Sequence, residues 1–88
     1  MNQPYEKPKL MPSAISFFKR IKGLEYPEYL ADNHPHILNR LYLIWGNPSE
    51  VRDYLNSLTL MDKSQQGFPL PAFKEIMYMQ EFHDHLYP

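Results

Sequence analysis

The chain contains no cysteine, and glycine is scarce, with three residues in 88. The lack of cysteine excludes disulfide bonds, thiolate metal sites and cysteine nucleophiles together. A chain without disulfides suits a reducing compartment, so we expect a cytoplasmic protein. The three glycines are isolated from one another, which excludes the glycine-rich loops that bind phosphate groups.

Long apolar runs are also missing. No stretch approaches the ~20 apolar residues that a membrane-spanning helix requires, so we expect no membrane span. Residues 1–10 are polar and precede the first apolar run, and this pattern does not fit a signal peptide. A chain of 88 residues has the usual size of one domain.

The net charge is only −1, which gives no general attraction to nucleic acid. The charge is unevenly distributed, however. Residues 1–24 carry five basic residues and one acidic residue, whereas residues 25–88 carry four basic residues and nine acidic residues. The basic third either docks on the acidic body of the same molecule or forms an asymmetric surface for a partner.

Proline is abundant, and it divides the chain into segments. Nine prolines are present, about twice the usual ~5% frequency. Residues 1–11 contain Pro4 and Pro8 without apolar periodicity, and we expect a flexible or extended arm there. Residues 12–88 show helical rather than alternating periodicity. We therefore predict a single all-α domain, a compact irregular bundle of four to five short helices with no sheet.

The first predicted helix begins at Pro12 and ends at Gly23. Its apolar side chains share one face, and its basic side chains lie on the opposite face. We interpret the apolar face as part of the core and the basic face as solvated. A helix that binds a membrane surface or a partner is the alternative. A second, short helical segment starts at Pro27, and Asp32 or Asn33 is expected to cap the helix that follows it.

The central helix is predicted from Pro35 to Trp45. Its apolar residues cover so wide an arc that other helices should surround it and bury Trp45. Gly46 is expected to end this helix in a left-handed conformation. Asn47 then caps the next helix, with Glu50 three residues later in a variant of the capping box.

A polar stretch from Leu60 to Pro69 is predicted to be the longest loop. The last helix follows from Pro69 or Pro71 to about Leu86. Six residues should form its apolar face: Phe73, Ile76, Met77, Met79, Phe82 and Leu86.

The histidines are candidate zinc ligands, because His34 and His36 flank a proline and His83 and His85 flank an aspartate. Helical residues two apart point about 200° from each other, so neither pair can bind one ion from one helix. We therefore predict no metal site and no cofactor. His83 should lie at the core edge, with its ring nitrogens bonded to a partner. An enzyme or metal protein would require His34, His36 and His83 to converge.

Other catalytic or nucleic-acid-binding features are weak. The serines lie in no nucleophile motif, and we predict a protein that is not an enzyme. The corner at Gly46 resembles a helix-turn-helix, but its second helix would expose Glu50 and Asp53 against Arg52, which repels phosphate. Nucleic acid is thus disfavoured as a partner. A nucleic-acid-associated regulator that uses the basic first helix remains the alternative function.

Seven tyrosines and five phenylalanines are more aromatic area than a core of this size hides, and exposed aromatic residues often anchor partners. We predict a protein-binding or self-association module, a homodimer included. Phe68 alternatively pins the start of the last helix. Leu43, if exposed, extends a partner patch. The candidate partner-binding residues lie on the first helix and on the loop before the last one: Lys19, Arg20, Lys22, Gln65, Gln66 and Phe68.

Overall fold

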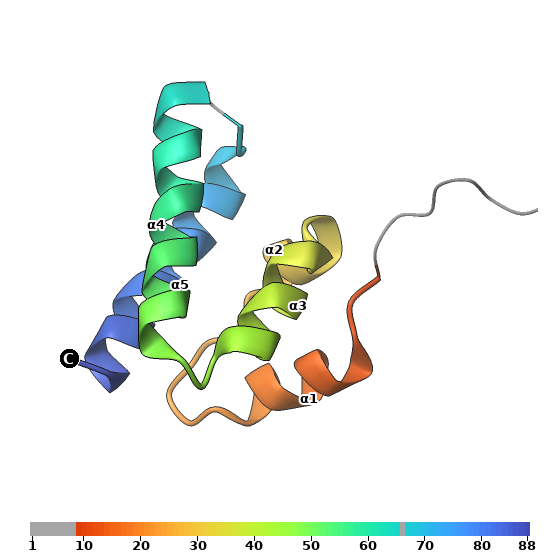
Figure 1. Cartoon of the computed structure of the whole chain (residues 1–88). Coiled ribbons are helices and arrows are strands. Elements are labelled where there is room, and N and C mark those ends of the chain that lie inside the picture. The colour runs from red at the N-terminus through yellow and green to blue at the C-terminus, as the bar shows by residue number, and fades with distance from the viewer. Residues whose placement is uncertain (1–8, 66) are drawn as a thin grey trace, which may run out of the picture.

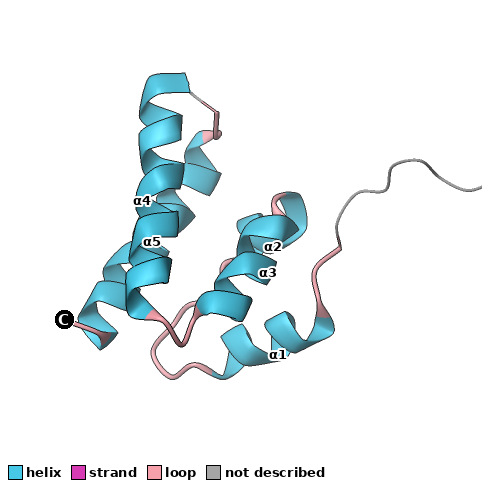
Figure 2. Ribbon diagram, viewed as in Figure 1, coloured by secondary structure: helices cyan, strands magenta, loops and turns pink. Residues whose placement is uncertain are grey.

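The computed structural model describes residues 9–65 and 67–88, with the backbone alone at 61–65. These residues form five helices and no strand (Figures 1 and 2). The predicted all-α bundle of four to five helices is therefore confirmed. The helices are α1 (Pro12–Arg20), α2 (Glu28–Asn33), α3 (Pro35–Ile44), α4 (Pro48–Gln65) and α5 (Leu70–Leu86).

The helices are arranged around an antiparallel pair. α4 and α5 run side by side in opposite directions, and the three shorter helices gather beside the lower part of this pair (Figure 1). α3 lies at the centre, because it packs against α1, α2 and α4, while α2 also packs against α5. Within the described part of the chain, none of the helices combines the length and apolarity needed to cross a membrane.

All five helices contribute to one hydrophobic core. Trp45, just after α3, is 7% exposed, which confirms its predicted burial. Fully burying a large apolar side chain stabilises the fold by ~1.5–3 kcal/mol. The buried apolar residues are Ala14, Phe18, Leu30, Ala31, Ile37, Leu38, Leu41, Trp45, Val51, Leu55, Leu58, Ala72, Ile76 and Met79.

The corner between α3 and α4 differs from the prediction at Gly46. Gly46 has no positive φ; among the described glycines, Gly23 has one, at +87°. Trp45 keeps a helical conformation, and the Asn47 N–H donates to the Ile44 carbonyl at 2.8 Å, so the turn needs no left-handed residue. The predicted capping box is present in a modified form. The Glu50 N–H donates to Asn47 Oδ1, and the Asn47 side-chain amide donates to the Glu50 carboxylate at 3.0 Å.

A pair of glycine substitutions tests this difference. We expect Gly23→Ala to destabilise the domain by about 1 kcal/mol or more, because L side chains are strained at positive φ. A Cβ at Gly23 would meet Phe82 at 3.7 Å, an ordinary contact, so strain and not a clash is the cause. Gly46→Ala is the control: apart from Gly46 and its two chain neighbours, no atom of the described residues lies within 4 Å of a new Cβ, and stability should hold or rise slightly. Equal losses in melting temperature for the two variants would contradict this assignment.

Two other details of the helix ends differ from those predicted: the end of α1 and the residue that caps α3. α1 ends at Arg20, before Gly23, and the chain continues extended at Ile21. Asp32 and Asn33 do not cap the next helix but belong to α2. His34 takes the cap position of α3 without a side-chain bond.

α4 is longer than predicted, because it continues through the expected loop as far as Gln65. Neither glycine nor proline occurs between Ser49 and Gln66, so no residue of that stretch breaks the helix. Gly67 is the first residue that interrupts the pattern. The connection before α5 is therefore short.

The end of the predicted N-terminal arm is attached to α3. The Met11 N–H donates to Asn39 Oδ1 at 2.9 Å, and the Asn39 side-chain amide donates to the Lys9 carbonyl at 2.8 Å. Leu10 and Met11 also pack against the core. Residues 1–8 lie outside the described part of the arm. Asn39, a polar interruption in an apolar helix, thus has a specific role.

Candidate functional site

The basic end of α1 is exposed to solvent. Lys19 and Arg20 form its last turn, Lys22 follows, and all three side chains are exposed. We call these three residues the basic surface. Lys19 Nζ lies 5.2 Å from the centroid of the Tyr26 ring, a cation–π contact. Each of these residues had been a candidate for partner binding from the sequence alone.

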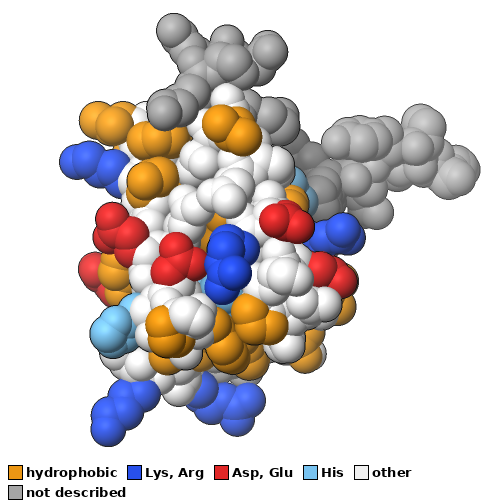
Figure 3. All heavy atoms as spheres, turned by 60° about the vertical axis from the view of Figure 1, so that its left-hand side comes forward, with side chains coloured by type: hydrophobic (Ala, Val, Ile, Leu, Met, Phe, Trp, Pro, Cys, Tyr) orange, Lys and Arg blue, Asp and Glu red, His pale blue; other side chains and the backbone are white. Residues whose placement is uncertain are grey.

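The basic surface is not neutralised by the acidic body. Among the described residues, Arg52 and Asp84 form an ion pair, with 3.5 Å between Nε and Oδ1. No ion pair among these residues involves the basic surface. Figure 3 shows acidic side chains interspersed with Lys and Arg side chains across the middle of one face, and Lys and Arg side chains without acidic neighbours at its lower end, the end where α1 lies in Figure 1. The described part of the basic third thus packs on the body through apolar contacts and backbone hydrogen bonds, but its cations form no ion pairs with acidic residues among the described ones.

A groove of about 400 Å³ adjoins the basic surface between α1 and α3. We call it the α1–α3 groove. Besides Pro12, its α1 wall consists of Ser13 and the residues three, four and seven positions after it, and this spacing places them on one side of the helix. Tyr42 contributes the α3 wall. The lining residues are Pro12, Ser13, Ser16, Phe17, Arg20 and Tyr42.

The sequence pattern identified only Arg20 of this groove as a site residue. It placed Phe17 and Tyr42 on buried arcs, but both side chains are only half-buried. The Phe17 ring lies 5.4 Å from the Tyr42 ring and 6.0 Å from the Trp45 ring, measured between centroids. The aromatic wall of the groove is thus supported by the core behind it.

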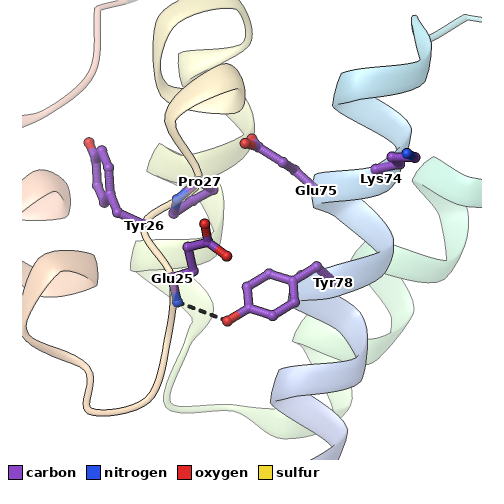
Figure 4. Close-up of a pocket in the computed structure, with 6 residues that line it drawn as sticks. All are labelled: Glu25, Tyr26, Pro27, Lys74, Glu75 and Tyr78. Carbon is purple, nitrogen blue, oxygen red and sulfur yellow. Dashed lines mark hydrogen bonds between the residues drawn. The ribbon is translucent and has the colours of Figure 1, made fainter.

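A second hollow, of about 330 Å³, lies between the segment before α2 and α5 (Figure 4). Two of its polar side chains, Tyr78 and Glu75, are already bonded. The Glu25 N–H donates to the Tyr78 hydroxyl at 2.8 Å, and the Glu75 carboxylate, which points toward the start of α2, accepts N–H groups from Tyr29 and Leu30. Lys74 points away from this contact (Figure 4). We therefore interpret the hollow as a joint between α2 and α5.

A third hollow, of about 250 Å³, lies at the α3–α4 corner. Arg40 is its one basic residue, against Glu50 and Asp53. The Glu50 carboxylate is bonded to Asn47 in the capping box. This hollow combines opposite charges and has no distinct binding chemistry.

The other candidate residues, near the start of α5, are placed differently. Gln66 lies outside the described residues, and so does the side chain of Gln65. Phe68 is half-buried, packs against the core and lies 5.4 Å from the His34 ring. This position agrees with the alternative role of Phe68, in which it pins the start of the last helix. Leu43 is 66% exposed, as a role in a partner patch requires.

The histidines considered as metal ligands do not converge. The rings of His34 and His36 are 6.0 Å apart, and His34 also contacts Phe68. His83 lies near the other end of α5, ~20 Å along the helix axis from Leu70. Among the described residues, no three His, Cys, Asp or Glu side chains are close enough to hold a metal ion. Burial, and to a smaller extent the neighbouring His36, lowers the pKa of His34.

His83 is fully buried, but its ring nitrogens lack the partner predicted for them. Neither Nδ1 nor Nε2 has a hydrogen-bond partner in the described structure. The ring lies between those of Trp45 and Tyr87, at centroid distances of 5.0 and 4.8 Å. The nearby Arg52 and Asp84 side chains pair with each other instead.

Acid should destabilise the fold through His83. Burial lowers the pKa of His83, the Asp84 carboxylate partly opposes this, and Arg52 adds to it. The unfolded chain therefore binds the proton more readily. The contribution of the neutral His83 ring to the free energy of unfolding is complete above about pH 6.5, the pKa of a histidine in the unfolded chain. As the pH falls below this value, the free energy of unfolding decreases by at most ~1.4 kcal/mol per pH unit.

Urea unfolding from about pH 7.5 to pH 5 checks this expectation, because the pH then crosses the ordinary histidine pKa. Trp45 fluorescence reports unfolding. In His83→Met the acid-dependent loss should shrink, since a thioether cannot take up the proton. His34→Gln is the matched control, because the pKa of His34 is lowered as well, and this variant shows how much of the acid-dependent loss comes from His34. An unchanged acid dependence in His83→Met would refute the role of His83.

Comparison of the chain with protein-family models, with curated proteins and with solved structures gives no match. The assignment of a site therefore depends on the chemistry of the residues themselves. The basic surface and the α1–α3 groove share Arg20. Together they combine unpaired cations, free hydroxyl groups and an aromatic wall in the described structure, a combination typical of partner recognition.

Proposed function

We propose that this chain is a small, non-enzymatic protein-binding module of the cytoplasm, which binds an acidic segment of another protein through the basic surface. The observation that supports this is the lack of carboxylate partners, among the described residues, for Lys19, Arg20 and Lys22. These cations lie exposed on a molecule whose residues 25–88 carry an excess of five acidic residues. An absence of cysteine suits the reducing cytoplasm.

Electrostatics favours a short acidic segment over a nucleic acid. A segment of a few residues can contact the basic surface alone and gain from charge complementarity. A long polyanion would also extend over the rest of the molecule, where residues 25–88 carry nine acidic residues against four basic ones, and it would be repelled there. A basic stripe along the whole binding face is the usual feature of nucleic-acid-binding domains.

A second copy of the chain is the other partner to consider. Such a contact would join the basic surface of one molecule to acidic side chains elsewhere on the next. The two surfaces differ, so the contact is heterologous, and its repetition gives rings or open chains and not a closed dimer. We therefore favour a separate protein as the partner.

Affinity capture from cytoplasmic extract with three forms of the chain tests the proposal. The first form is the wild type, and the second is the double variant Arg20→Glu, Lys22→Glu. The third is the control Arg40→Glu, Lys74→Glu, which changes the net charge equally at exposed residues of other helices. Lys19 is retained because it contacts Tyr26. The wild type and the control should capture the same partners, whereas the variant Arg20→Glu, Lys22→Glu should not capture them.

A zero-length carbodiimide cross-link then identifies the bonded groups. This reagent joins a lysine amine to a carboxylate that is in direct contact. Lys19 and Lys22 should be linked to Glu or Asp residues of the captured partner. Capture of the same proteins by all three forms, or capture abolished by nuclease, would contradict the proposal, and the second result would favour the nucleic-acid alternative.

A further inference from the structure

We propose, on the basis of the proposed function, that the α1–α3 groove selects which acidic segment binds. The groove accepts an aromatic side chain of the segment, while the Arg20 guanidinium binds the carboxylate of an adjacent Glu or Asp. The occupant is thus an acidic peptide of another protein in which an aromatic residue stands next to a carboxylate. The proposed function requires only charge, whereas this inference requires shape and apolar contact as well.

The size and location of the groove suit such a segment. Its volume of about 400 Å³ is within the ~300–1,000 Å³ range of pockets that hold small ligands. Arg20 lies at the C-terminal end of α1, and Phe17 lies one turn before it. An aromatic side chain in the groove therefore brings a neighbouring carboxylate toward the guanidinium.

The aromatic wall is held in place before any partner binds. Phe17 and Tyr42 meet edge to face, with their planes at 63°. Behind them, Phe17 contacts Phe18 at 5.1 Å and Trp45 at 6.0 Å, and both of these residues belong to the core. Aromatic rings favour such edge-to-face contacts, so a third ring can extend the cluster. A wall that does not rearrange loses little conformational entropy on binding.

The polar groups of the groove are available for a ligand. Ser13 and Ser16 are exposed, and neither hydroxyl takes part in a hydrogen bond within the described structure. Each can donate to, or accept from, the backbone of an extended segment. Arg20 has no carboxylate partner in the same part of the chain. Its planar guanidinium can bind both oxygens of one carboxylate, which gives the contact a defined direction.

The two other hollows lack this combination. In the hollow between α2 and α5, the Glu75 carboxylate would repel an acidic segment, and it is already bonded to α2. At the α3–α4 corner, Glu50 and Asp53 outnumber Arg40. An acidic ligand with an aromatic side chain therefore has one complementary hollow among those described here.

The test uses two labelled probe peptides, Glu-Glu-Tyr-Glu-Glu and Glu-Glu-Ala-Glu-Glu, titrated into the full chain and followed by amide NMR. The tyrosine peptide should bind about tenfold more tightly. It should also shift the amide signals of Ser16, Phe17 and Tyr42, while the alanine peptide should shift mainly those of the basic surface.

A variant that fills the groove separates shape from charge. Ser16→Trp places a ring in the groove from an exposed position and should abolish the tenfold preference without weakening the alanine peptide. Ser57→Trp, at an exposed serine of α4, is the control and should keep the preference. Circular dichroism verifies that both variants fold.

The outcomes distinguish the two proposals. If both peptides bind equally and Ser16→Trp changes neither, the groove inference is wrong, while binding of acidic segments stands. If neither peptide binds, both proposals are overturned. A tyrosine peptide that binds more tightly but shifts only amides outside the groove also overturns the groove inference.

Discussion

Replacing Phe18 with alanine is expected to destabilise the domain by about 3–5 kcal/mol, the usual loss for a buried phenylalanine. The Phe18 side chain is fully buried in the core, with 0% of its surface accessible to solvent. Its ring meets those of Phe17 and Trp45 edge to face, at 5.1 and 5.4 Å. Alanine would lose these contacts and leave a cavity. Among the described helices α1 packs against α3 alone, so it has no other helix to hold it.

Urea denaturation followed by circular dichroism measures this loss. Domains of this size have free energies of unfolding of about 5–15 kcal/mol, so Phe18→Ala would remove a large part of the total. Phe17→Ala is the matched control, because it makes the same chemical change at a half-buried neighbour and should cost less. Equal losses for the two variants would show that Phe18 does not anchor α1.

Replacing Glu75 with alanine is expected to cost about 2–3 kcal/mol, because a hydrogen bond to a charged group is worth up to ~1.5–3 kcal/mol and the half-buried position of Glu75 lowers the value of its two bonds. The Glu75 carboxylate accepts the N–H groups of Leu30, at 2.8 Å, and of Tyr29, at 3.2 Å. Both belong to the first turn of α2, whose cap residue, Pro27, makes no side-chain bond. Glu75 thus caps α2 from a distant helix, and its negative charge suits that helix end.

The Glu75 prediction has two readouts. Urea denaturation should show the full loss for Glu75→Ala and a smaller loss for Glu75→Gln, which keeps one acceptor oxygen. Hydrogen exchange at the Tyr29 and Leu30 amides should accelerate in both variants. The neighbouring Lys74→Ala, at an exposed position on the same helix, should leave stability and exchange unchanged. A Glu75→Ala loss no larger than that of Lys74→Ala would reject the cap.

The helices could be predicted because their signals are local. Pro12, Pro35 and Pro48 each stand at a helix start, as their fixed φ favours. The error at Gly46 has a local cause as well. A glycine after a helix favours a left-handed turn, but here the Asn47 N–H closes a tighter turn onto Ile44 that requires no such residue.

The candidate site was only partly predictable. Lys19, Arg20 and Lys22 could be named as candidates from the sequence because charge can be counted along a chain, and the structure shows that all three side chains are exposed. The groove could not, because periodicity shows which face of a helix is apolar but not how completely a neighbouring helix covers that face. Phe17 and Tyr42 therefore had the same pattern as core residues, although both remain half-exposed.

The sequence by itself determined the five helical segments and the prolines at their starts, since these follow from interactions within one or two helical turns, and the wide apolar arc of residues 35–45 indicated that Trp45 is buried. Only the tertiary structure decided that Glu75 caps a helix 45 residues earlier and that His83 is buried without a partner. It also decided that α1 leaves a groove beside Tyr42. The physical reason is that these features depend on the packing of segments far apart in the chain, which no local pattern encodes.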